Sequence, residues 1–226
     1  MNIVAIIPAR GGSKGIPRKN LINICGQPLI YWSISNALNT KLINSVWVTS
    51  DDNEIISISK KLGASTIRRP KELSNSNASS ESAWIHAINE IENKKKIDLV
   101  VAIQPTSPIR ESVDLSNAIK IMKEKKLDSL FSASAVKDRF IWVKDKMNKY
   151  IPYNHDMYDR RPRQKMKEKY LENGSFWIFK PDIIKKENNR LGGKIGCYVM
   201  DFYKSFQIDE YDDIKLCESV MKSFIF

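Results

Sequence analysis

Short apolar runs alternate with amphipathic stretches along most of the chain, and this alternation is the feature that most restricts its fold. Runs rich in Ile and Val predict buried strands, which lie at residues 2–8, 45–49, 99–104, 174–179 and 198–200. Apolar residues at helical spacing predict helices at residues 29–38, 53–62, 80–91, 112–124 and 211–222. Strands that alternate with helices form a mainly parallel sheet covered on both faces. The expected fold class is therefore α/β.

The length of 226 residues suits a single domain, 1–226. The alternation stops between Lys137 and Lys169, where aromatic and basic residues are interleaved with turn-forming residues. This segment is too short to fold alone. We interpret it as an inserted arm, 137–169, which protrudes and pairs with a second subunit. The sequence therefore predicts one domain that carries a small dimerisation arm.

The net charge of +11 raises the question of a nucleic-acid partner. Residues 137–169 hold 11 Lys and Arg against 5 Asp and Glu, so much of the excess lies in one segment. Concentrated positive charge also attracts small anions such as a nucleoside triphosphate or a sugar carboxylate. Because the sequence has no helix-turn-helix, RRM or zinc-finger pattern, we expect anionic small substrates and no nucleic-acid partner.

Several features bear on the cellular compartment. No apolar run reaches the roughly 18 to 20 residues that a membrane helix needs, so no membrane partner is expected. The N-terminal residues show neither the basic leader nor the cleavage site of an exported protein. Cys25, Cys197 and Cys217 lack the spacing of a zinc site or a disulfide framework. These observations favour a cytoplasmic protein.

The loop after the first predicted strand has the composition of a phosphate-binding site. Its sequence from Ile7 to Asn20 is IPARGGSKGIPRKN, which matches neither the P-loop nor the GxGxxG pattern. Glycines let backbone N–H groups approach anionic oxygens, here Gly11, Gly12 and Gly15. Cationic side chains supply charge-assisted donors, here Arg10, Lys14, Arg18 and Lys19. Ligands of parallel α/β sheets bind at the carboxyl ends of the strands, so we expect the site at this loop and at residues 49–52 and 104–110.

This loop resembles the N-terminal signature of the CMP-sialic acid synthetases, the acylneuraminate cytidylyltransferases. Further motifs of that family follow in the same order: RRPKEL at 68–73, ASS at 78–80, QPTSP at 104–108, PRQ at 162–164, ENG at 172–174 and IDEYDD at 208–213. The resemblance covers nearly the whole chain. It implies a Rossmann-like three-layer nucleotidyltransferase fold and a homodimer. It also implies an enzyme that uses CTP and Mg²⁺ to transfer CMP to a nine-carbon acidic keto-sugar, with release of pyrophosphate.

The resemblance implies a role for each residue that matches a family motif. The nucleotide would be bound by Arg10, Gly11, Gly12, Ser13, Lys19, Asn20, Arg69, Ala78 and Ser80. The sugar would be bound by Gln104, Arg163, Gln164, Asn173 and Trp177. Catalysis is expected to depend on Arg10, Lys19 and Asp209, because phosphoryl transfer needs positioning and neutralisation of charge more than covalent chemistry.

The chain departs from the family at the expected metal site. Many relatives carry two aspartates two positions apart, whereas this chain has Gln207 and Asp209. Mg²⁺ usually takes one or two carboxylates together with substrate phosphates. Asp209 is therefore the expected ligand, either with water and phosphate alone or with the side-chain carbonyl of Gln207. Asp212 and Asp213 are assigned instead to the first turn of the last helix, where carboxylates favour the helix dipole.

Other departures concern the pocket. Ser76 and Asn77 stand where relatives often have Asp-Thr, Trp177 replaces a smaller aromatic residue, and the segment 189–200 also differs, which leaves the identity of the sugar open. Neither His86 nor His155 is a clear general base, and metal-assisted deprotonation of the sugar hydroxyl would remove the need for one.

Three alternatives stay open at this point. An enzyme for the eight-carbon acid Kdo would share the fold, although its first loop typically lacks GSKG and the following Lys-Asn. A nucleotidyltransferase for a sugar phosphate would need a second phosphate site. A catalytically inactive relative that binds CTP is favoured only by Gln207, and the intact first loop and Asp209 argue against it.

Overall fold

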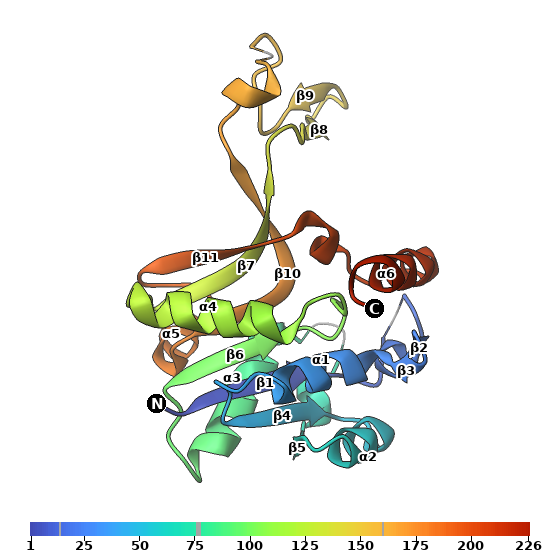
Figure 1. Cartoon of the computed structure of the whole chain (residues 1–226), viewed down its shortest axis with the longest axis vertical. Coiled ribbons are helices and arrows are strands. Elements are labelled where there is room, and N and C mark those ends of the chain that lie inside the picture. The colour runs from blue at the N-terminus through green and yellow to red at the C-terminus, as the bar shows by residue number, and fades with distance from the viewer. Residues whose placement is uncertain (14, 76–77, 160) are drawn as a thin grey trace.

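Among the residues that a computed structural model of the chain describes, 1–13, 15–75, 78–159 and 161–226, seven strands form the central sheet. They are β1 (Ile3–Pro8), β4 (Ser45–Ser50), β5 (Ser65–Arg68), β6 (Leu99–Ile103), β7 (Ser129–Val136), β10 (Lys169–Phe179) and β11 (Ile195–Met200). Their spatial order is β11-β7-β10-β6-β1-β4-β5 (Figure 1). Neighbours pair in parallel except at β10, which runs antiparallel to both β6 and β7. The predicted mainly parallel sheet is confirmed.

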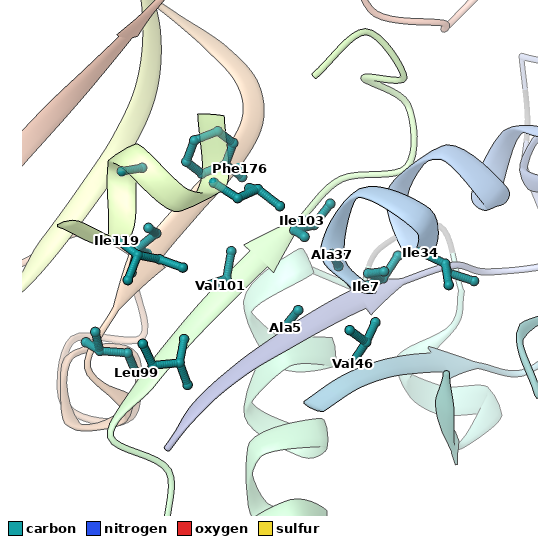
Figure 2. Close-up of a cluster of buried hydrophobic side chains, with 14 of the residues drawn as sticks. Ala5, Ile7, Ile34, Ala37, Val46, Leu99, Val101, Ile103, Ile119 and Phe176 are labelled. Carbon is teal, nitrogen blue, oxygen red and sulfur yellow. The ribbon is translucent and has the colours of Figure 1, made fainter. Parts of the chain in front are cut away.

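Helices cover both faces of this sheet. They are α1 (Leu29–Leu38), α2 (Asn53–Lys61), α3 (Ser80–Glu92), α4 (Ser112–Glu124), α5 (Pro181–Glu187) and α6 (Tyr211–Phe224). Successive side chains of a strand point to opposite faces. In β1, Ala5 and Ile7 pack with α1, α2 and α4 on one face, whereas Val4 and Ile6 pack with α3 and α5 on the other. Figure 2 shows Ala5 and Ile7 on the same side as Ile34 and Ala37 of α1. The result is a three-layer Rossmann-like architecture.

Several predicted elements have the observed bounds. The helices expected at 29–38 and 112–124 are α1 and α4, and α6 begins at Tyr211, with a capping box between Glu210 and Asp213. Strand β7 was not predicted, because serines occupy much of it. Ser132 is buried there at little cost, because its hydroxyl accepts from the Phe176 N–H and has two acceptors on β10, Oδ1 of Asn173 and the backbone oxygen of Phe176.

Residues 137–159 and 161–169 project away from the body of the molecule as an extension of β7 and β10 (Figure 1). A short antiparallel hairpin, β8 (Trp142–Lys144) and β9 (Tyr150–Pro152), lies near the tip, followed by the 3-10 helix η3 (Arg163–Lys165). Most large apolar side chains of this arm are exposed, and Tyr158 is 88% exposed. Its pairing with a second subunit stays a prediction.

A third apolar cluster lies beside the carboxyl end of the sheet and connects α6 to the first loop. Ile16 from that loop, Ile208, and Cys217 and Met221 from α6 are all buried in it. The small hairpin of β2 (Asn23–Ile24) and β3 (Gln27–Pro28) also contributes to it through Ile24. Because one cluster holds both chain segments, residues distant in sequence are brought to the same edge of the sheet.

The remaining regular elements are short 3-10 helices, η1 (Lys19–Leu21), η2 (Lys71–Leu73) and η4 (Phe202–Ser205). No helix among the described residues is long and apolar enough to cross a membrane.

Candidate active site

A cavity of about 680 Å³ opens at the carboxyl ends of β1 and β6, where the sequence predicted the site. Described residues of four chain segments meet there: the first loop, residues 69–75 with 78–80, the turn after β6, and residues 207–210. Many residues expected to bind substrate line it: Arg10, Ser13, Lys19, Asn20, Arg69, Ala78, Ser80, Gln104 and Asp209. The tertiary fold therefore assembles most of the predicted nucleotide site in one place.

Lys19 joins the first loop to the segment that precedes α6. Its Nζ atom donates to the backbone oxygen of Ile208 at 2.9 Å and to Oδ1 of Asp209 at 2.8 Å. The Lys19 side chain is 14% exposed, whereas that of Asp209 is 69% exposed. The amino group is thus held at the cavity wall while the carboxylate reaches into solvent, which suits a pair that binds a phosphate and a metal ion.

Asn20 and Arg10 determine the shape of the loop. Asn20 is buried, and its side-chain amide donates to the backbone oxygen of Arg10 at 3.0 Å. The Arg10 guanidinium donates to the backbone oxygen of Asn75 across the cavity mouth at 3.1 Å. These two bonds attach the loop to itself and to the segment that contains Asn75. In this state the Asn20 amide supports the loop backbone and does not project as a free donor.

Two other parts of the first loop face away from the cavity. Arg18 was expected to supply a donor for phosphate, but it pairs with Glu54 at 2.8 Å and with Asp52 at 3.3 Å, beside the N-terminus of α2. The Gly11 N–H donates to Asp51 at 3.0 Å, and a Cβ atom at Gly11 would lie 2.7 Å from Oδ2 of Asp52. Glycine is needed at position 11 for this close approach. Lys14, Ser76 and Asn77 lie outside the described residues.

Arg69 provides a buried cation at the cavity wall. The residue is 6% exposed, and its Nε and Nη2 atoms have no hydrogen-bond partner within the part of the chain that the structure describes. Burial lowers the pKa of the guanidinium, while the nearby Asp51 carboxylate raises it and Arg10 lowers it. Unpaired buried donors are costly, so this side chain is prepared to bind polar atoms of a ligand.

The segment 207–210 is attached to the sheet on two sides. The Ile208 N–H donates to the backbone oxygen of Thr106 at 2.8 Å, and the Gln207 amide donates to the backbone oxygen of Asn173 at 2.7 Å. The Asp209 N–H donates to Asp213, which also belongs to the capping box of α6. Asp209 is therefore placed by the bond from its own N–H to Asp213 and by the backbone bond of its neighbour Ile208, while the amide of Gln207 lies against Gly174, whose φ is +64°.

The residues present at this edge fit a magnesium ion that shares its ligands with a substrate. No cluster of three or more His, Cys, Asp or Glu side chains occurs among the described residues. Mg²⁺, however, needs only one or two carboxylates when phosphates and water complete its shell. Asp209 and Glu210 both line the cavity. A metal held jointly by protein and nucleotide is compatible with this arrangement.

Some residues expected to contact the sugar do not line the cavity. Trp177 lies in the core against Trp84, and Asn173 is buried, with its side chain hydrogen-bonded to Ser132, Ser175 and Met200. Gln164 is exposed in η3 of the arm; Arg163 belongs to the same turn, but its side chain lies outside the described residues.

Neither histidine lines the cavity. His86 lies within α3, and His155 packs against Phe140 and Trp142 in the arm. No general base is therefore apparent among the described histidines.

Two buried cations that do not line the cavity had not been assigned a role from the sequence. Arg110 is fully buried and donates to the backbone oxygens of Gln104, Ser107 and Ser175, and burial lowers its pKa to about 9. It therefore fixes the turn after β6. Lys204 pairs with Asp114 at 2.8 Å and with Glu111 at 2.7 Å. Burial opposes the charge on Lys204, but the hydrogen bonds to both carboxylates outweigh it and raise its pKa. An isolated Arg or Lys in a loop carries no sequence signal for such a role.

Comparison with known proteins connects this geometry to a family. A family model described as "Cytidylyltransferase" matches residues 4–220. The chain is 34% identical over 227 residues to N-acylneuraminate cytidylyltransferase from Oncorhynchus mykiss, covering 99% of this chain and 51% of the relative. It thus spans about half the length of that curated relative. It is also 35% identical over 183 residues to pseudaminic acid cytidylyltransferase from Campylobacter jejuni subsp. jejuni serotype O:23/36 (strain 81-176), covering 79% of this chain and 78% of the relative.

A solved structure of CMP:2-keto-3-deoxy-manno-octonic acid synthetase complexed with CTP has a similar fold. Its TM-score to this chain is 0.75 at 16% identity, with 99% of both chains covered.

Proposed function

The chain belongs to the cytidylyltransferase family, and from that premise we propose that it transfers CMP from CTP to the anomeric hydroxyl of a nine-carbon acidic keto-sugar, with release of pyrophosphate. The observation that carries the proposal is the cavity in which buried Arg69, Lys19 and the first loop converge at the carboxyl edge of the sheet. The named relatives act on N-acylneuraminate and pseudaminic acid. A sugar acid of that type is the substrate class we propose here.

The residues of the cavity divide into two groups by the chemistry they offer. Lys19 and Arg10 are cations on the first loop, and we assign them to the triphosphate, where they would neutralise the charge that develops on the leaving pyrophosphate. Arg69, Ala78 and Ser80 line the same cavity, with Ser80 as the first residue of α3, and we assign them to the cytosine base. The unpartnered Arg69 donors would hydrogen-bond the base, because they have no protein acceptor in the described chain.

We also propose Mg²⁺ as the cofactor, with Asp209 as its protein ligand. Bound there, the ion would screen the phosphate charges and acidify the sugar hydroxyl. Lys19 would then exchange its bond to Asp209 for a bond to the phosphate, while its bond to the Ile208 backbone oxygen keeps the side chain in position. The Gln207 amide would support this segment through Asn173 without acting as a metal ligand.

The remaining assignments concern the sugar and the second subunit. Gln104 lines the cavity and is proposed to contact the sugar. Arg163 and Gln164 lie on the arm, and we propose that the arm of a partner subunit brings them to the site in a homodimer. Exposed apolar side chains on the arm, such as Ile151 and Tyr153, support that pairing. A cytoplasmic location, where CTP is available, agrees with three free cysteines.

The proposal is tested by pyrophosphate release in the presence of Mg²⁺. CTP, UTP, GTP and ATP are offered in turn against neuraminate, legionaminate, pseudaminate, Kdo and sugar 1-phosphates. Release with CTP and one nine-carbon acid is the expected result. Release with a sugar 1-phosphate alone, or silence with every acid in protein shown to bind CTP, contradicts the proposed reaction.

A further inference from the structure

Arg190 lies in a layered cluster that no part of the proposed reaction uses. The central carbon of its guanidinium is 4.3 Å from the centre of the Trp177 ring and 4.9 Å from that of Trp84. Its Nε and Nη2 atoms bond to Oε1 of Glu81 at 2.8 and 2.7 Å. Both charged side chains are mostly buried, at 22% and 15% exposure. Such a planar, forked cation between aromatic rings and a carboxylate is specific to arginine.

The acidic partner of this cluster lies at the cavity end of α3. Glu81 is the second residue of that helix, and the residues before it, Ala78, Ser79 and Ser80, line the cavity. Ser79 caps the helix by accepting a bond from the Ser82 N–H. An anchor on Glu81 therefore fixes the orientation of the turn that we assign to the nucleotide base.

Arg190 itself comes from the loop between α5 and β11, more than a hundred residues away in sequence. That loop belongs to the segment 189–200, and Trp177 was expected to contact the sugar. Trp177 instead supplies the flat face on which the guanidinium lies, and its ring N–H is held by Glu172 at 2.7 Å. Two of the positions at which this region departs from the family, Trp177 and Arg190, thus lie against each other outside the cavity lining.

We propose that Arg190 is a positioning residue that holds the cavity end of α3 in the geometry needed to bind CTP; this inference rests on the proposed function. Without the ion pair between Arg190 and Glu81, the first turn of α3 keeps its Ser79 cap but loses its attachment to Trp177 of the sheet. The base would then bind less often in the correct orientation. The chemical step involves other groups and is expected to change less than nucleotide binding.

A matched control lies at the opposite end of the same helix. Lys185 of α5 pairs with Glu92, the last residue of α3, and these side chains are 35% and 24% exposed. Lys185→Gln therefore removes an ion pair between α3 and a neighbouring segment without touching the cavity. Comparison with this variant separates a local effect on the nucleotide from a general loosening of the helix.

The experiment measures CTP affinity by isothermal titration calorimetry, together with KM for CTP and kcat, for Arg190→Gln, Arg190→Lys, Glu81→Gln and Lys185→Gln. We expect Arg190→Gln and Glu81→Gln to weaken CTP binding about five- to tenfold, with kcat changed less than about twofold. The CTP affinity of Arg190→Lys should lie between those of the wild type and Arg190→Gln, because lysine keeps the charge but lacks the planar, forked guanidinium. Lys185→Gln should bind CTP like the wild type.

Each other outcome has a distinct meaning. Wild-type protein that does not bind CTP would overturn the proposed function itself. Wild-type protein that binds CTP, together with an Arg190→Gln variant that is folded by circular dichroism and binds equally well, would overturn the role of Arg190. Equal weakening by Arg190→Gln and Lys185→Gln would also overturn it, because the effect would then belong to the whole helix. If Arg190→Gln does not fold, Glu81→Gln decides by the same criteria.

Discussion

The cavity and the arm differ in the side chains that they present: a buried cation at the cavity, and exposed aromatic residues on the arm. At the cavity, Arg69 is 6% exposed and has buried donors without a partner among the described residues. On the arm, Tyr153 and Tyr158 are 71% and 88% exposed. Buried polar groups without partners indicate a polar ligand, whereas exposed apolar groups indicate another protein surface. Substitutions in the body and in the arm should therefore have different consequences.

The largest effect on stability is expected in the core of the body. Phe176 is fully buried on β10 and packs near Tyr198. Phe176→Ala should lower the free energy of unfolding by about 3–5 kcal/mol, because it leaves a cavity in a close-packed core. Tyr158→Ala on the arm should change it by less than about 0.5 kcal/mol. Urea denaturation of both variants measures these changes. An equal loss of unfolding free energy in Tyr158→Ala would contradict the expected difference between core and arm.

The next largest effect concerns activity at the first loop. Lys19→Met should lower kcat/KM for CTP by about 10²–10³-fold, because it removes a cation aimed at developing charge. Arg18, its neighbour in sequence, pairs with Glu54 outside the cavity. Arg18→Met should change kcat/KM by less than about threefold. Steady-state pyrophosphate release measures both. A comparable loss from the two variants would mean that Arg18 turns into the cavity when substrate binds.

A smaller effect is expected from pH at a buried thiol in the body. Burial raises the pKa of the Cys217 thiol to about 12 from 9.0, with Asp213 and Cys25 adding to the shift. The folded state thus keeps a proton that the unfolded state releases, so this contribution to stability is present below pH 9 and is lost as pH rises toward 12.

The wild type should therefore lose its advantage over Cys217→Ala by about 1.4 kcal/mol per pH unit above pH 9. Urea denaturation at pH 9 and pH 10 checks this prediction. A difference between the two proteins that does not change with pH would show that the thiol titrates near its ordinary value when folded.

The smallest effect on folding and the clearest effect on association are expected on the arm. Ile151 in β9 and Leu216 in α6 are both 43% exposed. If the proposed homodimer forms through the arm, Ile151→Asp should convert dimer to monomer at micromolar concentration, while Leu216→Asp should not. Neither should change the free energy of unfolding of the monomer by more than about 0.5 kcal/mol. Sedimentation velocity distinguishes the outcomes, and a monomeric wild type would contradict the proposed dimer.

Sequence reasoning succeeded where the signal was local. The bounds of α1 and α4 follow from apolar periodicity alone. The first loop was predicted to bind phosphate from its glycines and cations. It failed where buried polar residues replaced apolar ones, as in β7, where Ser132 is buried through hydrogen bonds to β10. Trp177 was assigned to the sugar, but it lies in the core beneath Arg190.

The sequence by itself determined the alternation of strands and helices, and hence the edge of the sheet at which a ligand binds, because both depend on neighbours within a few residues. Only the tertiary structure decided that Lys19 faces the cavity while Arg18 faces α2, that Gln207 supports Asn173, and that Arg190 clamps Glu81. Each of these contacts joins residues 34 or more positions apart. Their formation depends on how the layers pack, which no local pattern of residues records.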